Sequence, residues 1–521
     1  MTQESKYANL RELVRHAAEH FPETRFFLCQ DERLPFLRGK ELYDLCGRAA
    51  GALSMLPKKS HIAILGPGSA AWLVAYFAVV SAGHVIVPMH DGMRQGELDT
   101  CIRHADCVLL LYDSTREKSA RELQKQIDGL RIWELHDFLY DLTKIETSVY
   151  PPLQSDEIAA MYFTSGTTAR SRCVMLTHNN IGSEISAICS ALPLSEKDIG
   201  LSLLPLSHTF EMMTYIAGAL HCGGTLYINE SVRTVKRNLR DKHPTILVVV
   251  PLILQTLRKE ILATAKKRGK LEHLERVLKL NQTLQKFGLD LSQQLFPDVH
   301  AILGGQLHTV ICGGAALDPD LIRFFHALGI EVLQGYGITE CSPVVTMNPP
   351  GHNRIGSVGK CLSCCEVMLQ DREICVRGAS VSPGYYKDPE ANVASFRAGW
   401  FHTGDLGRFD QKGYLYFTGR LKNLIILANG ENVSPEELEE RLYQIDGILD
   451  AVVYEKEGII RAELYVDRNL IPDATAAWKF VTPINRSMAS YKQIGEIVLR
   501  DTEFEKTVTR KIKRYKLERS E

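Results

Sequence analysis

The 521-residue sequence has almost no net charge and no long uninterrupted apolar run. Its formal charge at pH 7 is −1, which argues against a general binder of nucleic acid or membranes. The longest apolar stretch, 70–88, is interrupted by Ser81 and Gly83. We therefore expect a buried helix over 70–82, a glycine cap and a short strand over 85–87, and no transmembrane helix.

The chain also lacks internal repeats, low-complexity segments and a signal peptide at its start. Its 13 cysteines are odd in number and irregularly spaced, and none follows Cys375. This usage is typical of reduced thiols, so we expect a cytoplasmic protein. The cluster Cys361, Cys364 and Cys365 has no second Cys/His pair at a zinc-like spacing, which argues against a metal there.

Short apolar runs alternate with helical stretches over most of the chain. The runs cover 61–66, 107–112, 246–251 and 309–314. Such alternation predicts an α/β fold, with helices on the faces of a parallel sheet. The polar helical stretch at about 252–296 fits surface helices, and an amphipathic element at a membrane surface is the alternative.

The pattern changes after Val358. Short strands and glycine turns at about 355–419 predict a β-rich subdomain. From Pro435 the order is helix, strand, strand, helix and strand, which predicts a compact α+β unit. We therefore expect an α/β protein with a large N-terminal domain of parallel or mixed sheets over 1–421, which includes the β-rich part, and a small C-terminal domain over 422–521.

A hydroxyl-rich stretch follows the apolar run 158–163, and a helix is expected to begin at Thr177. Backbone N–H groups exposed in one small turn suit phosphate oxygens, and Arg170 and Arg172 would add charge and forked donors. An ordinary Ser/Thr-rich surface turn is the alternative, and the Walker pattern is absent from the chain. The residues of the turn are Thr164, Ser165, Gly166, Thr167 and Thr168.

Six stretches carry motifs in one order: Tyr-Phe-Thr-Ser-Gly-Thr-Thr-Ala-Arg-Ser-Arg (162–172), Leu-Pro-Leu-Ser-His-Thr-Phe-Glu (204–211), Gln-Gly-Tyr-Gly-Ile-Thr-Glu (334–340), Gly-Trp-Phe-His-Thr-Gly-Asp (399–405), Gly-Arg-Leu-Lys-Asn-Leu-Ile-Ile (419–426) with Gly-Glu-Asn-Val (430–433), and Glu-Lys-Thr-Val-Thr-Arg-Lys-Ile-Lys-Arg (505–514). Together they resemble the acyl-adenylate-forming superfamily of AMP-dependent synthetases and ligases, over essentially the whole chain. The second and sixth stretches look most like long-chain fatty acyl-CoA synthetases.

The resemblance implies a nucleotide site around 334–340. Tyr336 would offer a flat face to adenine, and Gly335 and Gly337 would let the base approach the backbone. Thr339 would bond the α-phosphate as one of the catalytic residues. A plain turn followed by a helix cap is the alternative for this stretch.

Other residues of this site would bind metal and ribose. In similar enzymes the residue at Glu340 binds Mg²⁺, and Thr164 is a second candidate ligand. Asp405 would accept hydrogen bonds from both ribose hydroxyls, because a carboxylate offers two acceptor oxygens and no donor. Arg420 would help to hold ribose or phosphate. The alternatives are an Asx-turn for Asp405 and a surface salt bridge for Arg420.

The resemblance also implies an acyl site. Gly313, Gly314 and Ala315 would lie beside the adenine and the acyl group, where small residues keep the space open. His208 and Phe210 would lie at the mouth of the acyl pocket. The alternatives are a tight strand-to-helix turn for the small residues and a structural role for the histidine.

Lys511 is the expected catalytic residue, with Arg172 as a second cation. The reaction brings a carboxylate onto a phosphate, and a long ammonium on a mobile C-terminal domain would neutralise both as they close. The alternative is that Lys511 is one of several cations in a solvated tail. Lys422 matches the hinge about which similar enzymes swing the small domain, and Gly430 would then face the thiol substrate.

The sequence departs from the family pattern at three places. The loop usually reads Gly-x-Pro-Lys-Gly where this chain has Ala-Arg-Ser-Arg-Cys (169–173). Any requirement for φ > 0 at Ala169 or Cys173 would strain the backbone. The Cys-Leu-Ser-Cys-Cys turn (361–365) and Arg510 also differ from the usual residues. These departures bear on the rate more than on the class of reaction.

We therefore expect a ligase that uses ATP, Mg²⁺ and coenzyme A. A fatty acid would attack MgATP to give acyl-AMP and pyrophosphate, and the acyl group would pass to coenzyme A, releasing AMP. The alternatives are a carrier-protein thiol as acceptor, an amino acid as substrate, and a nucleotide-binding protein without catalysis. No nucleic acid is expected as a partner, and at most peripheral membrane contact.

Overall fold

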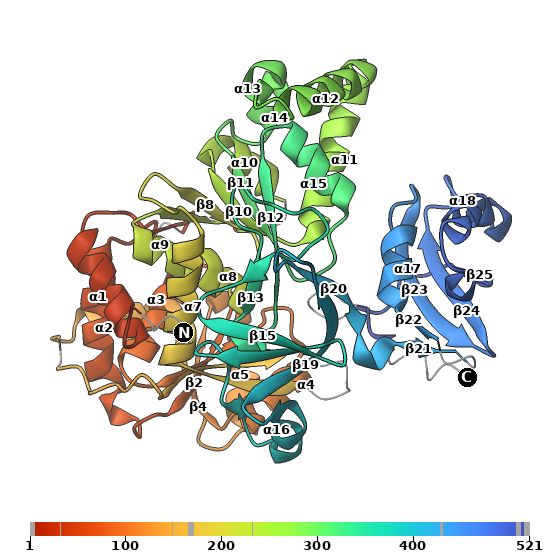
Figure 1. Cartoon of the computed structure of the whole chain (residues 1–521). Helices are drawn as coiled ribbons and strands as arrows, with labels where there is room; N and C mark the ends of the chain where they lie inside the picture. Colours follow the sequence, from red (N-terminus) through yellow and green to blue (C-terminus); the bar gives the residue numbers. More distant parts are fainter. Residues whose placement is uncertain are drawn as a thin grey trace. The chain divides into compact units, whose positions relative to one another are not determined.

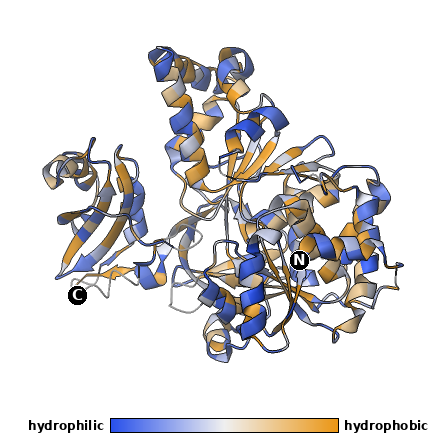
Figure 2. Ribbon diagram, turned by 180° about the vertical axis from the view of Figure 1, so that it is seen from behind, coloured by the Kyte–Doolittle hydropathy of each residue, from blue (hydrophilic) through white to orange (hydrophobic). Residues whose placement is uncertain are grey.

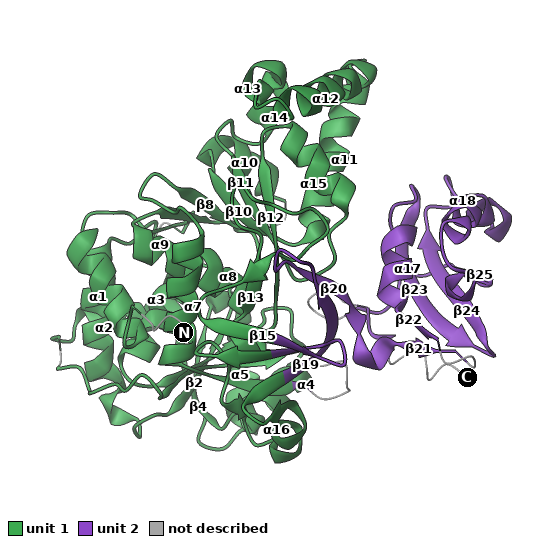
Figure 3. Cartoon of the chain, viewed as in Figure 1, with its two compact units in different colours: residues 1–164, 172–367, 376–401 green, residues 165–171, 368–375, 402–521 purple. Residues whose placement is uncertain are grey.

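The computed structural model describes residues 6–31, 33–147, 149–164, 171–231, 233–427, 431–506 and 512–514. The chain forms two compact units (Figure 3). Unit 1 comprises 1–164, 172–367 and 376–401, and unit 2 comprises 165–171, 368–375 and 402–521.

The first sheet of unit 1 has seven strands in the order β17-β7-β6-β3-β2-β4-β5 (Figure 1). The five strands from β6 to β5 are parallel, whereas β7 and β17 run antiparallel to their neighbours. The bounds are β2 (His61–Leu65), β3 (Val85–Met89), β4 (Cys107–Tyr112), β5 (Arg131–Glu134), β6 (Ile158–Thr164), β7 (Arg172–Thr177) and β17 (Gly384–Tyr385).

The second sheet of unit 1 has eight strands in the order β1-β9-β8-β10-β11-β12-β13-β14. The six strands from β1 to β12 are parallel, and β13 and β14 are antiparallel. The expected α/β class with parallel and mixed sheets is therefore confirmed. The bounds are β1 (Phe27–Leu28), β8 (Ile199–Ser202), β9 (Thr225–Ile228), β10 (Ile246–Val249), β11 (Thr309–Cys312), β12 (Glu331–Gly337), β13 (Val344–Met347) and β14 (Lys360–Cys361).

The helices of unit 1 cover these sheets, and apolar residues concentrate on the strands (Figure 2). Within the described residues, no helix combines the length and the apolar character needed to cross a bilayer. The helices are α1 (Leu10–His20), α2 (Gly39–Ala52), α3 (Ala70–Ser81), α4 (Gln95–His104), α5 (Glu117–Gln126), α6 (Leu135–Thr143), α7 (His178–Ala191), α8 (Thr209–Glu211), α9 (Ala217–Cys222), α10 (Val235–Lys242), α11 (Pro251–Lys267), α12 (Leu271–Gln285), α13 (Ser292–Leu295), α14 (Pro297–Ile302), α15 (Pro319–Ala327) and α16 (Pro389–Ser395).

Helix α3 matches the apolar stretch that the sequence singled out. All of its residues are buried, and the Ser69 hydroxyl caps it by accepting the Trp72 N–H at 3.1 Å. Gly83 follows at φ +83, a conformation that glycine adopts without strain, and β3 begins two residues later. The expected order of helix, glycine cap and strand is confirmed.

Strand β7 was not expected. The sequence suggested a phosphate-binding turn between a strand and a helix, but the structure places β7 between the turn and α7, antiparallel to β6. Cys173, Val174 and Leu176 are buried, and an apolar strand pairs with β6 more stably than an extended loop would. Thr177 is the N-cap of α7, so the predicted helix start is confirmed.

Unit 2 contains a three-stranded sheet flanked by two helices. Strand β23 (Ile448–Lys456) is antiparallel to β24 (Ile459–Val466), which is parallel to β25 (Glu496–Arg500). Helices α17 (Pro435–Leu442) and α18 (Ala474–Arg486) complete the helix–strand–strand–helix–strand order predicted from sequence.

The other strands lie before this sheet in the chain. Strands β15 (Cys365–Gln370), β16 (Glu373–Gly378) and β19 (Trp400–Phe409) each contribute residues to both units. The remaining ones are β18 (Phe396–Arg397), β20 (Leu415–Arg420), β21 (Ile425–Ile426) and β22 (Asn432–Val433). The expected domain boundary at 421–422 falls inside unit 2, and Lys422 as a pivot stays a prediction.

Candidate functional site

Small residues follow β11 at the carboxyl edge of the second sheet. The Gly313 N–H donates to the Val249 carbonyl oxygen at 3.2 Å, and Gly314 has φ +82. A Cβ atom at Gly313 would lie 3.1 Å from the Phe210 ring. The structure therefore brings together Phe210 and Gly313, both predicted for the acyl site. Gly314 and Ala315 are exposed beside them in sequence.

His208 is the N-cap of α8, which opens the helical stretch 209–222. This stretch contains a π-helical turn at Met212–Ile216. π-Helical turns are rare and occur frequently at functional sites. The His208 and His90 rings lie 5.5 Å apart, and burial lowers the pKa of His90. His208 therefore lies beside a second imidazole that sequence reasoning did not identify.

Glu211, the last residue of the motif at 204–211, is buried. Burial raises the pKa of Glu211 to about 8, although hydrogen bonds from the Ser202 side chain and from backbone groups of Leu203 and Leu204 oppose this shift. Hydrogen bonds to Glu211 thus connect α8 with residues 202–204, which precede His208 in the chain. The motif contains this residue, but the sequence alone predicts no role for it.

Tyr336 lies at the end of β12, opposite Thr346 of β13, and is buried. A Cβ atom at Gly335 would lie 3.0 Å from the Thr346 carbonyl oxygen, and one at Gly337 would clash with the Pro343 carbonyl oxygen. The close approach of the chain at Pro343, just before β13, therefore requires glycine at 337, and Gly335 lies in a tight contact with β13. Sequence reasoning had assigned them to the approach of a base.

Glu340 is buried in the 3₁₀ turn Thr339–Cys341 that follows β12. Its carbonyl oxygen accepts the Ser382 N–H at 2.8 Å. Its Oε1 accepts the hydroxyl of Tyr385 at 2.8 Å. These bonds fix both the backbone and the carboxylate of the residue predicted to bind a metal.

Tyr385 of β17 connects Glu340 to Arg172. The Arg172 guanidinium carbon lies 4.9 Å from the centre of the Tyr385 ring, and its Nη1 donates to the Tyr385 hydroxyl at 3.5 Å. Burial raises the pKa of Tyr385, and the nearby Glu340 raises it further, while Arg172 acts in the opposite sense. The tyrosine is therefore a neutral donor to Glu340 across the physiological range.

Thr164 completes this group. It pairs with Arg172 across the β6–β7 hairpin, and its hydroxyl lies 3.5 Å from the Arg172 carbonyl oxygen. Three residues predicted from sequence, Thr164, Arg172 and Glu340, thus form one cluster. Tyr385, which joins them, lies outside all six motifs, so the sequence analysis did not predict it. An aromatic residue beside a glycine was the only local signal.

The expected strain at Cys173 is absent. This residue pairs with Phe163 inside β7 and has no positive φ. The strand conformation accommodates a side chain where the family pattern has glycine. Ala169, the other position of expected strain, lies outside the described residues.

Asp405 and Arg420 meet within unit 2. They are directly opposed on β19 and β20, and Arg420 Nε lies 3.2 Å from Asp405 Oδ1. The Asp405 side chain is 6% exposed and that of Arg420 is 35% exposed. Lys422 is exposed in the 3₁₀ turn Leu421–Asn423. The two residues predicted to hold ribose therefore form an ion pair, in which the Asp405 carboxylate is buried and the Arg420 guanidinium is partly exposed.

The remaining predicted residues lie outside the part of the chain that the structure describes: Ser165, Gly166, Thr167, Thr168, Gly430 and Lys511.

A second group of potential metal ligands lies in unit 2. Among the described residues, Glu373, Cys375 and His402 have ligand atoms within 4.8 Å of one another. His402 Nδ1 lies 2.9 Å from Glu373 Oε2 and 3.4 Å from Cys375 Sγ. Hydrogen bonds among the three side chains account for this arrangement without an ion.

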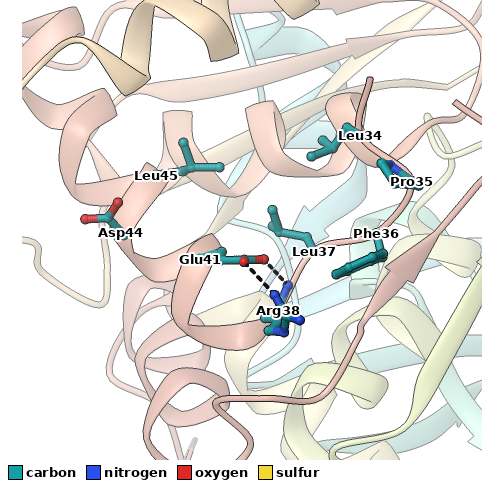
Figure 4. A pocket seen from close by; sticks show the side chains of 8 residues that line it. All are labelled: Leu34, Pro35, Phe36, Leu37, Arg38, Glu41, Asp44 and Leu45. Atoms are coloured by element: carbon teal, nitrogen blue, oxygen red, sulfur yellow. Dashed lines mark hydrogen bonds and ion pairs between the residues drawn. The ribbon is translucent and has the colours of Figure 1, made fainter. Parts of the chain in front are cut away.

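A surface hollow of about 380 Å³ lies elsewhere in unit 1, at the start of α2 (Figure 4). A salt bridge of 3.0 Å between Arg38 and Glu41 crosses it. Its lining contains none of the predicted site residues. The lining residues are Leu34, Pro35, Phe36, Leu37, Arg38, Glu41, Asp44 and Leu45.

The sequence profile of the family described as "AMP-binding enzyme" matches residues 14–386. The chain belongs to this family. The matched region contains the whole cluster of Thr164, Arg172, Glu340 and Tyr385, as well as Tyr336. Asp405, Arg420 and Lys422 follow it. The resemblance seen in the sequence motifs is thus confirmed at the level of the family.

Individual relatives of this chain are distant. Long-chain-fatty-acid–CoA ligase 6 of Homo sapiens is 29% identical over 429 residues, which cover 73% of this chain and 61% of that protein. The chain therefore spans less than two thirds of that relative's length.

Two solved structures share the fold. An anthranilate CoA ligase in complex with anthranoyl-AMP superposes with a TM-score of 0.83 at 19% identity, covering 99% of this chain and 97% of that one. An o-succinylbenzoate coenzyme A synthetase of Bacillus subtilis, in complex with ATP and magnesium ion, gives 0.77 at 23% identity, covering 99% and 100%.

Proposed function

We propose that this AMP-binding chain activates a fatty acid as an acyl-AMP and transfers the acyl group to the thiol of coenzyme A. The observation that supports it most directly is the link from Arg172 through Tyr385 to Glu340. These contacts place a cation, a neutral hydroxyl and a carboxylate next to one another in space, beside the first residue of β7. A triphosphate with a divalent ion needs groups of these kinds.

The residues present fit Mg²⁺. Glu340 offers hard carboxylate oxygens, and the Tyr385 hydroxyl orients one of them, as outer-shell partners do for metal ligands. Thr164 would supply a hydroxyl from the same cluster. When bound, the ion would neutralise charge on the phosphate oxygens.

In the first half-reaction the substrate carboxylate attacks the α-phosphorus of ATP and pyrophosphate leaves, so no protein nucleophile is required. The protein contributes position and charge. Arg172 would neutralise phosphate oxygens, and Thr339 would donate to the α-phosphate. Tyr336 would hold adenine, with ribose on Asp405. Lys511 would bridge the two anions as they react.

In the second half-reaction the thiol attacks the acyl carbonyl and AMP leaves. We propose that the small C-terminal domain, 422–521, turns at Lys422 between the two steps and brings Gly430 toward the thiol. Exposure of Lys422 in a short 3₁₀ turn is compatible with a pivot. A cytoplasmic location is proposed from the reduced cysteines.

The choice of a fatty acid is supported by relatives at 26% to 29% identity that are named long-chain-fatty-acid–CoA ligases. Phe210 beside Gly313 would give the acyl group an apolar contact. A carrier protein in place of coenzyme A is the second candidate acceptor.

The test is a panel of carboxylates from butanoate to octadecanoate, scored by AMP release with and without coenzyme A. We expect AMP release that rises with chain length and requires the thiol for turnover. Exchange of pyrophosphate into ATP only with amino acids would contradict the substrate class. ATP binding without pyrophosphate release under any carboxylate would contradict catalysis.

A further inference from the structure

Cys361 differs from every other cysteine of the chain. All thirteen cysteines lie in the described residues, all are free thiols, and Cys361 alone is exposed. Thiols react with oxidants through their thiolate form, and reaction also requires access. An added oxidant therefore meets Cys361 first.

A second thiol lies next to Cys361. Cys361 ends β14 and Cys365 begins β15, with a turn between them in which the Cys365 N–H donates to the Leu362 carbonyl oxygen at 3.3 Å. The Sγ atoms of Cys361 and Cys365 are 3.6 Å apart. A disulfide of about 2.05 Å would need them to close by roughly 1.5 Å, which side-chain rotation in a short turn can supply.

Cys364, the third thiol of this turn, has a different environment. It is fully buried, and its Sγ lies 4.0 Å from Oε2 of Glu184. Cys365 is also buried, and its hydrogen bonds with the Cys361 thiol and then the Cys364 thiol, with burial in addition, raise the pKa of Cys365. Cys361 is thus placed to react first and Cys365 to react second.

We propose that Cys361 and Cys365 form a peroxide-sensitive dithiol, whose oxidation closes an intrachain disulfide across the β14–β15 turn. The Cys361 thiolate attacks a hydroperoxide, giving a sulfenic acid and water (or an alcohol from an organic peroxide). The Cys365 thiol then attacks the sulfenic sulfur, forming the S–S bond and releasing a second water. Two electrons pass from the two thiols to the peroxide, and a dithiol reductant reverses the step.

The pair is connected to Tyr336 through the sheet. Cys361 is directly opposite Thr346 on β13, and Thr346 is directly opposite Tyr336 on β12. Gly337 and Gly359 leave no space for a Cβ atom against β13 and its flanks, so these strands are tightly packed. Pulling Cys361 toward Cys365 therefore displaces the row that holds Tyr336. This consequence rests on the proposed nucleotide site.

The experiment uses the full chain, reduced and then treated with hydrogen peroxide. Before treatment, 5,5′-dithiobis(2-nitrobenzoate) should titrate one fast thiol, which Cys361→Ser removes. After treatment the fast thiol should be lost, and the peptide 361–372 should carry an internal disulfide that dithiothreitol reverses. Cys364→Ser is the matched control, because it leaves the reacting pair intact and should still form the bond.

Two results would overturn the dithiol. One is a disulfide that persists in Cys361→Ser, because the pair would then be Cys364 with Cys365. The other is oxidation of Cys361 to sulfinic acid without any disulfide.

Equilibrium dialysis with ATP tests the link to Tyr336. We expect oxidation to weaken ATP binding at least threefold in the wild type and in Cys364→Ser, but not in Cys361→Ser. An unchanged ATP affinity with the disulfide formed would overturn the link. Failure of the reduced wild type to bind ATP would instead contradict the proposed nucleotide site.

Discussion

At the scale of single residues, Tyr385 contacts two residues that are far apart in the sequence, Glu340 and Arg172. Its hydroxyl serves Glu340, and its ring faces the Arg172 guanidinium. The two functions are separable, because removal of the hydroxyl leaves the ring in place. Tyr385 therefore allows the orientation of Glu340 to be tested without loss of the Arg172 contact.

Tyr385→Phe should weaken Mg²⁺ binding without preventing folding. We expect the Mg²⁺ concentration for half-maximal AMP formation to rise by about tenfold or more, because outer-shell partners contribute on this scale. Tyr386→Phe is the matched control, since that hydroxyl bonds the exposed Asp106 at 2.7 Å. Equal Mg²⁺ titrations for the two variants would show that the Tyr385 hydroxyl does not orient Glu340.

Glu211 should make stability depend on pH. Its pKa of about 8 in the folded chain exceeds that of an ordinary glutamate, so the folded state binds the proton more tightly than the unfolded state. This stabilisation is fully present below the unfolded pKa and is lost as pH rises through about 8. Relative to Glu211→Gln, the wild type should lose up to about 1.4 kcal/mol per pH unit in this window.

Unfolding measured from pH 5 to pH 9 checks this expectation. Glu117→Gln, which alters an exposed glutamate of α5, should follow the wild type throughout. Parallel curves for the wild type and Glu211→Gln would mean that Glu211 does not titrate in this range.

At the scale of elements, a continuous apolar run was sufficient to predict a helix that is buried on every side. Helix α3 is apolar on every side, and its cap and terminating glycine could both be recognised in the sequence. Strand β7 could not be recognised, because it begins with Arg172 and follows a stretch dominated by loop residues. Its identity as a strand depends on pairing with β6, a contact that no local pattern records.

The same limit applied to the site. The family motifs pointed to Glu340, Arg172 and Asp405 as candidate site residues, and their roles stay predictions. They did not identify Tyr385 or the second role of Gly335 and Gly337, since both depend on which strands lie next to one another. Sequence therefore supplied candidates for the reacting groups but not the residues that lie against them.

Close packing of β12 against β13 predicts the effect of Gly337→Ala. The added methyl would clash with the Pro343 carbonyl oxygen, a backbone atom that cannot rotate away. We expect a loss of about 1–3 kcal/mol in stability and weaker ATP binding, as for overpacked cores. Gly96→Ala is the control, because nothing lies within 4 Å of a Cβ there. A melting temperature for Gly337→Ala equal to that of the control would contradict the close approach.

At the scale of the whole molecule, the candidate residues are divided between the two units. Tyr336, Glu340 and Arg172 belong to unit 1, whereas Asp405, Arg420 and Lys422 belong to unit 2, as does the tail with Lys511. A reaction in two steps can use such a division, because groups carried by one part can serve one step and be absent from the next. The two half-reactions should then respond differently to substitutions in unit 2.

Lys511→Ala tests this division most directly. Removal of the ammonium should slow acyl-AMP formation by at least about 10², as expected for loss of one charge-stabilising donor, and should largely spare thioester formation from supplied acyl-AMP. Lys513→Ala is the matched control, because it removes a cation of the same tail that pairs with Glu505 at 3.0 Å. The measurements are pyrophosphate release for the first step and acyl-CoA formation for the second. An equal fall in both steps for Lys511→Ala would mean that this lysine supports the fold of the tail and does not act in one half-reaction.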